Sequence, residues 1–258
     1  MKAIRFAANA ALLLSLLPAF AWAQSSTDAP GASSDQWQFR IAPNLWAAGL
    51  DGTSRVGGAS ETRVDASFSD ITEVLDMGFM TALEARRGPW GIVGDVFYVN
   101  LGEKTQPLQN DLGRVDASIK NTIFHLAVAY RVAESASGHV DVLGGARYSE
   151  VESELKLPSS TTYPDGVRVK GSDDWVDAIV GLRGVHRFND KWAANGYVDV
   201  GLGGDDSSWQ AMAGIEYVIS HTTQVEFGYR YLSQDYDSAK FAYEMDTAGP
   251  FLGMSFWF

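Results

Sequence analysis

The chain contains no cysteine among its 258 residues. That absence excludes a disulfide scaffold, a cysteine-ligated zinc site and a cysteine nucleophile. Positive charge is also scarce, because 20 Lys and Arg residues face 32 Asp and Glu residues, for a net charge of −12. Such an acidic balance argues against nucleic acid as a partner and against electrostatic docking on anionic lipid. Beyond residue 23 there is no long apolar run, so no transmembrane helix is predicted.

The first 23 residues have the pattern of a secretory signal peptide. A basic start precedes a short apolar stretch, and Ala21–Ala23 form a small-x-small cleavage site. Gln24 follows where a lipoprotein would carry cysteine. Residues 24–35 are small and polar and predict a disordered lead-in. No linker follows, so residues 36–258 are predicted to form one domain.

From Gln36 to the last residue, apolar and polar side chains alternate between turn residues, which is the pattern of half-buried strands. Turn signals such as Asp51-Gly52 and Asn189-Asp190 predict antiparallel hairpins. The fold class is therefore all-β. We expect about twelve strands, over residues 36–49, 53–57, 60–68, 77–87, 90–101, 115–131, 139–155, 171–187, 191–202, 208–219, 222–235 and 241–258.

The strand count has alternatives. The hairpin of 53–57 with 60–68 is short and could be an excursion from the wall, which would leave ten strands, and eight is also open. Residues 69–76 read as a single helical turn capped by Ser69 or Asp70. Long polar connections are expected at about 102–114, 156–170 and 233–240, alternating with short turns as in an outer-membrane barrel.

Alternation alone would also suit a soluble sandwich, whose apolar face points inward. The end of the chain favours a membrane barrel, because it resembles the C-terminal targeting strand of bacterial outer-membrane barrels. Its alternate positions are apolar and the last residue is aromatic. The expected assembly signal comprises Leu252, Met254, Phe256 and Phe258.

Aromatic and basic residues support the same choice. Trp90, Trp192, Trp209 and Tyr217 lie near predicted turns on the apolar face, where an aromatic girdle meets lipid headgroups. Lys is almost confined to loops, while the polar strand face carries Arg, whose planar fork suits paired and partly desolvated charge. We predict a closed antiparallel transmembrane β-barrel in the bacterial outer membrane.

Six stretches carry a resemblance to known proteins. They are VDASFSDI (64–71), EARRGPWGIVGDVFYVNL (84–101), DWVDAIVGLRGVHRFNDKW (174–192), WQAMAGIEY (209–217), EFGYRYLSQDYD (226–237) and GPFLGMSFWF (249–258). Through them the domain resembles a group of uncharacterised proteobacterial outer-membrane β-barrel proteins that is broadly porin-like. The resemblance implies the fold and the location, and it transfers no catalytic residue.

If the apolar face meets lipid, twelve charged side chains point into the lumen. Two hypotheses compete for them. They form an interlocked set of ion pairs in a filled barrel, or they line a narrow water-filled channel whose excess of carboxylates favours cations. The expected lumen charge network comprises Arg40, Glu84, Arg86, Asp95, Asp141, Arg147, Asp177, Arg183, Asp199, Glu216, Glu226 and Arg230.

Enzymatic activity is not predicted. His125 lies on the polar face with Ser118 and Ser149 as the nearest nucleophile candidates, but no G-x-S-x-G or similar context surrounds either serine. The other histidines lack a metal-ligand spacing, so neither a metal site nor a cofactor is expected. Acidic clusters in the outer loops suggest solvated surface or cation bridging to lipopolysaccharide. These clusters comprise Glu150, Glu152 and Glu154; Asp173 and Asp174; Asp205 and Asp206; Asp235 and Asp237.

These observations predict a monomeric outer-membrane barrel that acts as a structural barrel or as a narrow passive pore for small solutes. A surface protein that binds a ligand through its outer loops is the alternative, and a barrel lipid hydrolase is a weaker one. The expected partners are outer-membrane lipid, lipopolysaccharide and the barrel-assembly machinery.

Overall fold

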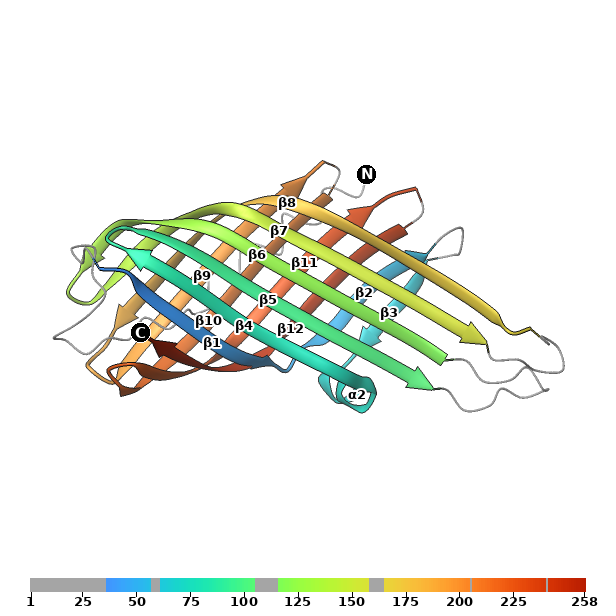
Figure 1. Ribbon diagram of the computed structural model, residues 1–258, viewed down its shortest axis with the longest axis horizontal. Coiled ribbons are helices and arrows are strands. Elements are labelled where there is room, and N and C mark those ends of the chain that lie inside the picture. Colours follow the sequence, from blue (N-terminus) through green and yellow to red (C-terminus); the bar gives the residue numbers. More distant parts are fainter. Residues whose placement is uncertain (1–35, 57–60, 105–115, 158–164, 205, 240) are drawn as a thin grey trace.

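The computed structural model describes residues 36–56, 61–104, 116–157, 165–204, 206–239 and 241–258, and nearly all of these lie in strands (Figure 1). The predicted signal peptide at 1–23 and the lead-in at 24–35 fall outside the described residues. Within the described ranges no helix is long and apolar enough to cross a bilayer.

Twelve strands form one antiparallel sheet. In chain order they are β1 (Gln38–Trp46), β2 (Gly49–Val56), β3 (Thr62–Ala66), β4 (Leu75–Arg87), β5 (Trp90–Lys104), β6 (Asp116–Ser135), β7 (Gly138–Leu157), β8 (Val167–Arg187), β9 (Trp192–Gly203), β10 (Asp206–Ser220), β11 (Thr223–Asp237) and β12 (Phe241–Trp257). One short helix, α2 (Phe68–Val74), separates β3 from β4.

The sheet closes on itself, because β1 pairs with β4 on one edge and with β12 on the other. Ten strands, β1 and β4 to β12, therefore form the closed wall, and the β2–β3 hairpin is additional. The expected barrel is confirmed: twelve strands form the sheet, and ten of them form the closed wall, as in the alternative in which the short hairpin is an excursion. The reason lies in β12, whose partner changes from Trp46 of β1 at Phe251 to Gly49 of β2 at Ala248. The β2–β3 hairpin thus continues the pairing along the edge of β12 on which β1 lies.

Several strands run further than the sequence suggested. β5 runs to Lys104, β7 runs to Leu157 and β8 starts at Val167, so these strands take in the ends of the connections predicted at 102–114 and 156–170. Charged residues near these ends bond across strands, with Lys170 Nζ 3.3 Å and Lys120 Nζ 3.7 Å from Glu152 Oε2. Polar composition was mistaken for loop, because these strands extend beyond the apolar band and carry charge on their surface.

The helix α2 confirms the expected helical turn with a different start. Its N-cap is Ser67, not Ser69 or Asp70. Ser67 and Asp70 form a capping box, in which the Asp70 backbone N donates to Ser67 Oγ at 3.3 Å and the Ser67 backbone N donates to Asp70 Oδ2 at 2.9 Å.

Short turns and the two strand ends at residues 38 and 257 define one end of the barrel, which we call the turn end; the opposite end is the loop end. Apolar side chains cover the outer wall between them, with Val180 62% exposed. Aromatic pairs border this band. Trp90 with Tyr130 (centroids 4.6 Å apart) lies at the turn end, and Trp209 with Tyr231 (4.7 Å) lies toward the loop end. Their separation marks the headgroup regions of a spanned membrane.

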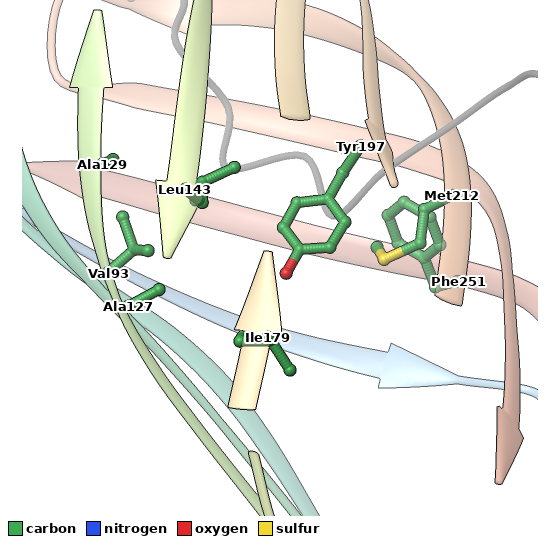
Figure 2. Packing of buried hydrophobic residues seen from close by; sticks show 8 residues of the cluster. All are labelled: Val93, Ala127, Ala129, Leu143, Ile179, Tyr197, Met212 and Phe251. Atoms are coloured by element: carbon green, nitrogen blue, oxygen red, sulfur yellow. The ribbon is translucent and has the colours of Figure 1, made fainter. Parts of the chain in front are cut away.

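Small and medium apolar residues also fill part of the interior. Figure 2 shows this cluster, to which Tyr197, Met212 and Phe251 contribute the larger side chains. Val93 and Ala129 in the same cluster are completely buried. These compact residues leave room for the long arginine side chains that share the lumen.

Candidate functional site

All twelve charged side chains expected in the lumen are buried, each with at most 3% of its surface exposed. Strand alternation positions them, since successive side chains in a strand point to opposite faces of the wall. The structure gathers most of them into two layers, which we call the inner cluster near the turn end and the middle cluster.

The inner cluster centres on Arg183 of β8. Its guanidinium donates to Glu84 at 2.9 and 3.2 Å and to Asp141 Oδ2 at 2.9 and 3.0 Å. Arg86 donates to the same Asp141 oxygen at 2.5 Å and to Glu84 Oε1 at 3.2 Å. These four residues come from β4, β7 and β8, so the cluster crosses the lumen from wall to wall.

Arg131 of β6 belongs to the inner cluster although the sequence-based network omitted it. Its Nε donates to Asp141 Oδ1 at 3.0 Å, and its Nη1 lies 3.6 Å from Glu134. Arg131 lies on the polar face of its strand, an even number of residues from His125. This alternation was the sequence signal that Arg131 points into the lumen. Asp141 therefore accepts from three arginines.

The middle cluster centres on Arg147 of β7. Its Nη2 donates to Asp199 Oδ1 at 2.5 Å and its Nη1 donates to Ser208 Oγ at 2.7 Å. The Ser208 hydroxyl in turn donates to Asp177. Ser208 thus links a cation to a second carboxylate, a role that charge patterning could not reveal.

Gln210 extends the middle cluster to the opposite wall. Its Nε2 donates to Asp199 at 2.6 Å, and its Oε1 accepts from Arg230 Nη2 at 3.0 Å. Arg230 also donates to Asp95 at 3.2 Å, and its guanidinium carbon lies 4.7 Å from the Trp46 ring centroid. An ion pair and a cation–π contact therefore hold the same guanidinium.

Arg40, Glu216 and Glu226 complete the set. Glu216 and Glu226 are register partners on β10 and β11, and Glu216 accepts from Asn195 at 2.6 Å. The Arg40 charge lies near both carboxylates and its guanidinium is 5.8 Å from the Trp257 ring centroid. This arrangement places one cation beside two facing carboxylates.

Little free space remains between the clusters. A cavity of about 20 Å³ lies there, lined by Arg40, Asp95, Glu226 and Arg230 among others. A volume of that size holds about one water molecule. The side chains of the clusters therefore occupy most of the space around this cavity.

The loop-end half of the lumen is mainly apolar and holds none of the twelve expected charges, which the sequence analysis did not anticipate. Trp175, Tyr243 and Met245 are buried there with Val151, and Trp175 stacks on Tyr236 with centroids 4.4 Å apart. A signal was present in β12, where Phe241, Tyr243 and Met245 put three large apolar side chains on the inward face. A cavity of about 460 Å³ lies beside these residues.

His125 and the two serines weighed with it do not meet. His125 Nε2 lies 3.4 Å from the Tyr197 hydroxyl, and Ser149 Oγ accepts from Gln234 at 2.8 Å. Ser118 is opposite Glu154, seven residues along the strand from His125. Within the described residues these groups form no nucleophile–base pair.

Three members of the acidic clusters, Glu152, Glu154 and Asp237, form ion pairs with basic side chains. Glu150, Glu152 and Glu154 lie in β7 rather than in a loop, because this strand continues to Leu157. Glu154 Oε1 is 2.5 Å from Arg168 and 3.0 Å from Lys156. Asp205 falls outside the described residues, and the described ones contain no group of three or more potential metal ligands.

The four residues of the predicted assembly signal all point outward. Leu252 is 51% exposed, Met254 and Phe256 are 39% exposed, and Phe258 is 74% exposed. They form an apolar stripe on the outer face of β12, next to β1.

Neither a family model nor a curated protein matches the chain. Among solved structures, the outer membrane protease OmpT from Escherichia coli matches with a TM-score of 0.55 and 10% identity, over 87% of this chain and 97% of that one. The chain has the fold of a bacterial outer-membrane β-barrel. Two further matches of this type are Ail of Yersinia pestis (TM-score 0.36, 14% identity, 86% and 99% coverage) and OprG from Pseudomonas aeruginosa (0.38, 13%, 88% and 98%).

These similarities concern the fold alone, and the proteins named have several different activities. The fold agrees with the predicted outer-membrane location and with the porin-like resemblance of the sequence. The apolar outer band and its aromatic borders supply the physical reason, because such a wall is stable only against lipid.

Proposed function

We propose that this protein is an integral outer-membrane barrel whose lumen is closed to ions, a structural barrel and not an open passive pore. The observation that carries the proposal is the inner cluster, in which Arg183 and Arg86 reach Glu84 and Asp141 across the lumen. Side chains that bond to one another at 2.5 to 3.2 Å occupy the space that hydrated ions would need.

Energetics support the closed state. Breaking a buried ion pair costs about 3–5 kcal/mol, because the remaining partner is left charged and unpaired. Opening a pore would break several such pairs in both clusters. Their arginines are held by two or more acceptors each, as with Arg147 on Asp199 and Ser208. Thermal fluctuation therefore opens the lumen rarely.

Single-channel recording in a planar bilayer tests the proposal. We expect the refolded wild type to give no discrete conductance steps. A variant with Arg147→Gly, Arg183→Gly and Arg230→Gly removes three of the five arginines of the two clusters and should conduct. A matched variant with Val180→Ala on the lipid face should stay silent, and all three proteins are first shown to be folded by heat-modifiable gel mobility.

Discrete cation-preferring steps in the wild type would contradict the closed lumen. If those steps also changed with Asp177→Asn and Glu226→Gln, they would establish the narrow pore instead. Silence of the triple glycine variant, with folding shown, would mean that these three arginines are not the barrier and would contradict their role in closing the lumen.

A further inference from the structure

The barrel wall is incompletely paired in its loop-end half. β1 pairs with β4 only from Gln38 to Pro43, where Pro43 faces Thr81. Beyond that point β1 pairs with β12 alone, and β4 from Leu75 to Met80 pairs with β5 alone. Pro43 has no backbone N–H to donate, which suits a strand edge where pairing ends.

We call the unpaired stretch between residues 44–46 of β1 and 75–80 of β4 the seam. Nothing else in the described sheet fills it. The only partner of β3 there is β2, so the edge of β3 that faces β4 and β5 carries no strand. Helix α2 bridges the gap between β3 and β4 (Figure 1). It has no buried residue and is held at its start by the Ser67–Asp70 capping box. A single helical segment thus borders the opening on the side of the loop end.

The cavity of about 460 Å³ passes through this seam. Its lining includes inward side chains, such as Ile123 (2% exposed) and Leu232 (1%), and outward ones, such as Phe79 (52%) and Leu45 (75%). A barrel wall is one residue thick, so a cavity lined from both faces is open to the lipid side. Its size falls in the range of small-molecule sites.

The lining is uncharged throughout the described residues, which include Leu50, Ile71, Phe97 and Phe251. Because burying an unpaired charge is costly, the cavity suits a neutral ligand. One polar group stands out. Asn121 lines the cavity, is 8% exposed and donates to the Tyr243 hydroxyl at 3.3 Å, while its Oδ1 has no hydrogen-bond partner among the described atoms.

The unpaired amide oxygen defines the ligand further. A buried acceptor without a partner costs about 1–3 kcal/mol, and a ligand with one N–H or O–H group would recover that energy. If the Asn121 amide were turned over, its NH₂ group would be the free one, and the ligand would then supply an acceptor. In either orientation the Asn121 amide offers the ligand one hydrogen bond, and most of the surrounding lining is apolar.

Trp46 closes the cavity on the side of the turn end. Its indole N–H donates to Gly249 O at 3.1 Å, and its ring packs edge-on against Phe97 with centroids 5.7 Å apart. Arg230 and the middle cluster lie directly behind it. A ligand in the cavity is therefore separated from the turn end by the ion pairs.

We propose that this cavity binds a small, neutral, mainly apolar molecule carrying one hydrogen-bonding group, which enters sideways from the outer leaflet between β1 and β4. The inference is independent of the closed lumen, because the seam and the cavity lie on the loop-end side of Trp46.

N-phenyl-1-naphthylamine is a suitable probe, since it is neutral and aromatic with a single N–H. Its fluorescence is titrated against refolded protein in zwitterionic micelles, with empty micelles subtracted. We expect one saturable site in the wild type. Gly78→Trp should weaken it at least tenfold, because Gly78 lines the cavity and an added Cβ would meet only Leu75, at 3.6 Å, so the new ring fills the seam.

Gly144→Trp is the matched control. A Cβ at Gly144 of β7 meets nothing within 4 Å, so the variant adds the same ring away from the cavity and should bind like the wild type. If Gly78→Trp fails to fold, Val64→Trp in the hairpin fills the cavity from outside the closed wall. Equal binding by all folded variants, or no saturable binding by the wild type, would overturn the proposal.

The route of entry has its own test, which the lack of native cysteine makes simple. Ile123→Cys is reacted in phosphatidylcholine vesicles with neutral N-phenylmaleimide and with a trimethylammonium methanethiosulfonate. We expect the neutral reagent to react at least tenfold faster, and Gly78→Trp to slow it tenfold. Val198→Cys on the lipid face should react regardless of residue 78. Rapid reaction with the charged reagent, unaffected by Gly78→Trp, would show entry from the aqueous side and overturn the sideways route.

Discussion

Phe39 and Phe258 exchange both of their backbone hydrogen bonds, at 2.9 and 3.0 Å, and their rings stack with centroids 6.1 Å apart. The last residue of the chain therefore closes the barrel against its first strand. Because Phe39 also pairs with Ala85 of β4, it joins the C-terminal strand to the rest of the wall.

Phe258→Ala should reduce the folded fraction of the protein several-fold in the outer membrane. The substitution keeps the backbone bonds and removes the apolar ring from the outward stripe of β12, where Phe258 is 74% exposed. The heat-modifiable fraction on gels of isolated outer membranes measures the effect. Phe258→Tyr should assemble nearly normally, and normal levels of Phe258→Ala would show that the terminal ring has no part in assembly.

Arg183→Met should lower the free energy of unfolding by about 3–5 kcal/mol, because it leaves Glu84 and Asp141 short of a buried partner. Tryptophan fluorescence during urea unfolding in micelles gives the value. Leu182→Ala, one residue away on the lipid face, serves as the comparison and should cost much less. A loss below 1 kcal/mol for Arg183→Met would mean that the cluster relaxes around the gap.

Val180→Arg should cost about 2–4 kcal/mol, the usual penalty for a cation at the midplane of the lipid face, whereas His186→Arg near the turn end should cost at most about 1 kcal/mol. Val180 is 62% exposed on the outer wall. Reversible folding into lipid vesicles measures both. Equal penalties would place the membrane elsewhere on the wall.

Trp90 and Tyr130 should be energetically coupled by about 0.5–1.5 kcal/mol, since their rings lie 4.6 Å apart at a 56° tilt. A double-mutant cycle with Trp90→Ala and Tyr130→Ala gives the coupling energy. Trp90 with Trp192, which has its own partner Tyr217, provides a pair with no expected coupling.

The α2 cap predicts a pH dependence. Hydrogen bonds from Ser67 lower the pKa of the Asp70 carboxyl below its ordinary 3.8. A depressed carboxyl pKa means that the cap contributes fully above pH 3.8 and is lost as the pH falls through the lowered pKa. Ser67→Ala should raise the pKa of Asp70 in an NMR titration. Thr72→Ala, which removes a hydroxyl that bonds to Ser69 O, should leave that pKa unchanged.

The period of two was sufficient to place Arg183 and Asp141 on the inner face, because side-chain direction in a strand depends only on position along it. The seam could not be predicted in this way. Where β1 stops pairing with β4 depends on Pro43 and on β12, a strand from the other end of the chain. Local patterns carry no information on such distant pairing.

The apolar half of the lumen was missed for a related reason. Tyr243 and Met245 face inward, yet they alternate with Ala242 and Glu244, so the stretch gives no clear inward polar face. Because every inward position was expected to be polar, charged side chains were predicted throughout the lumen. Arg131 was on the correct face, but only the fold shows that it meets Asp141.

Strand β12 is bonded along one edge by β1 and then by β2. β1 also pairs with β4, and β2 also pairs with β3, so each of them has one edge that only β12 covers. A nascent chain that ends before residue 241 would leave both β1 and the β2–β3 hairpin with an open edge, which invites aggregation. Docking of β12 is thus the event that seals the cylinder, and a chain without this strand differs from a closed barrel by its free edges.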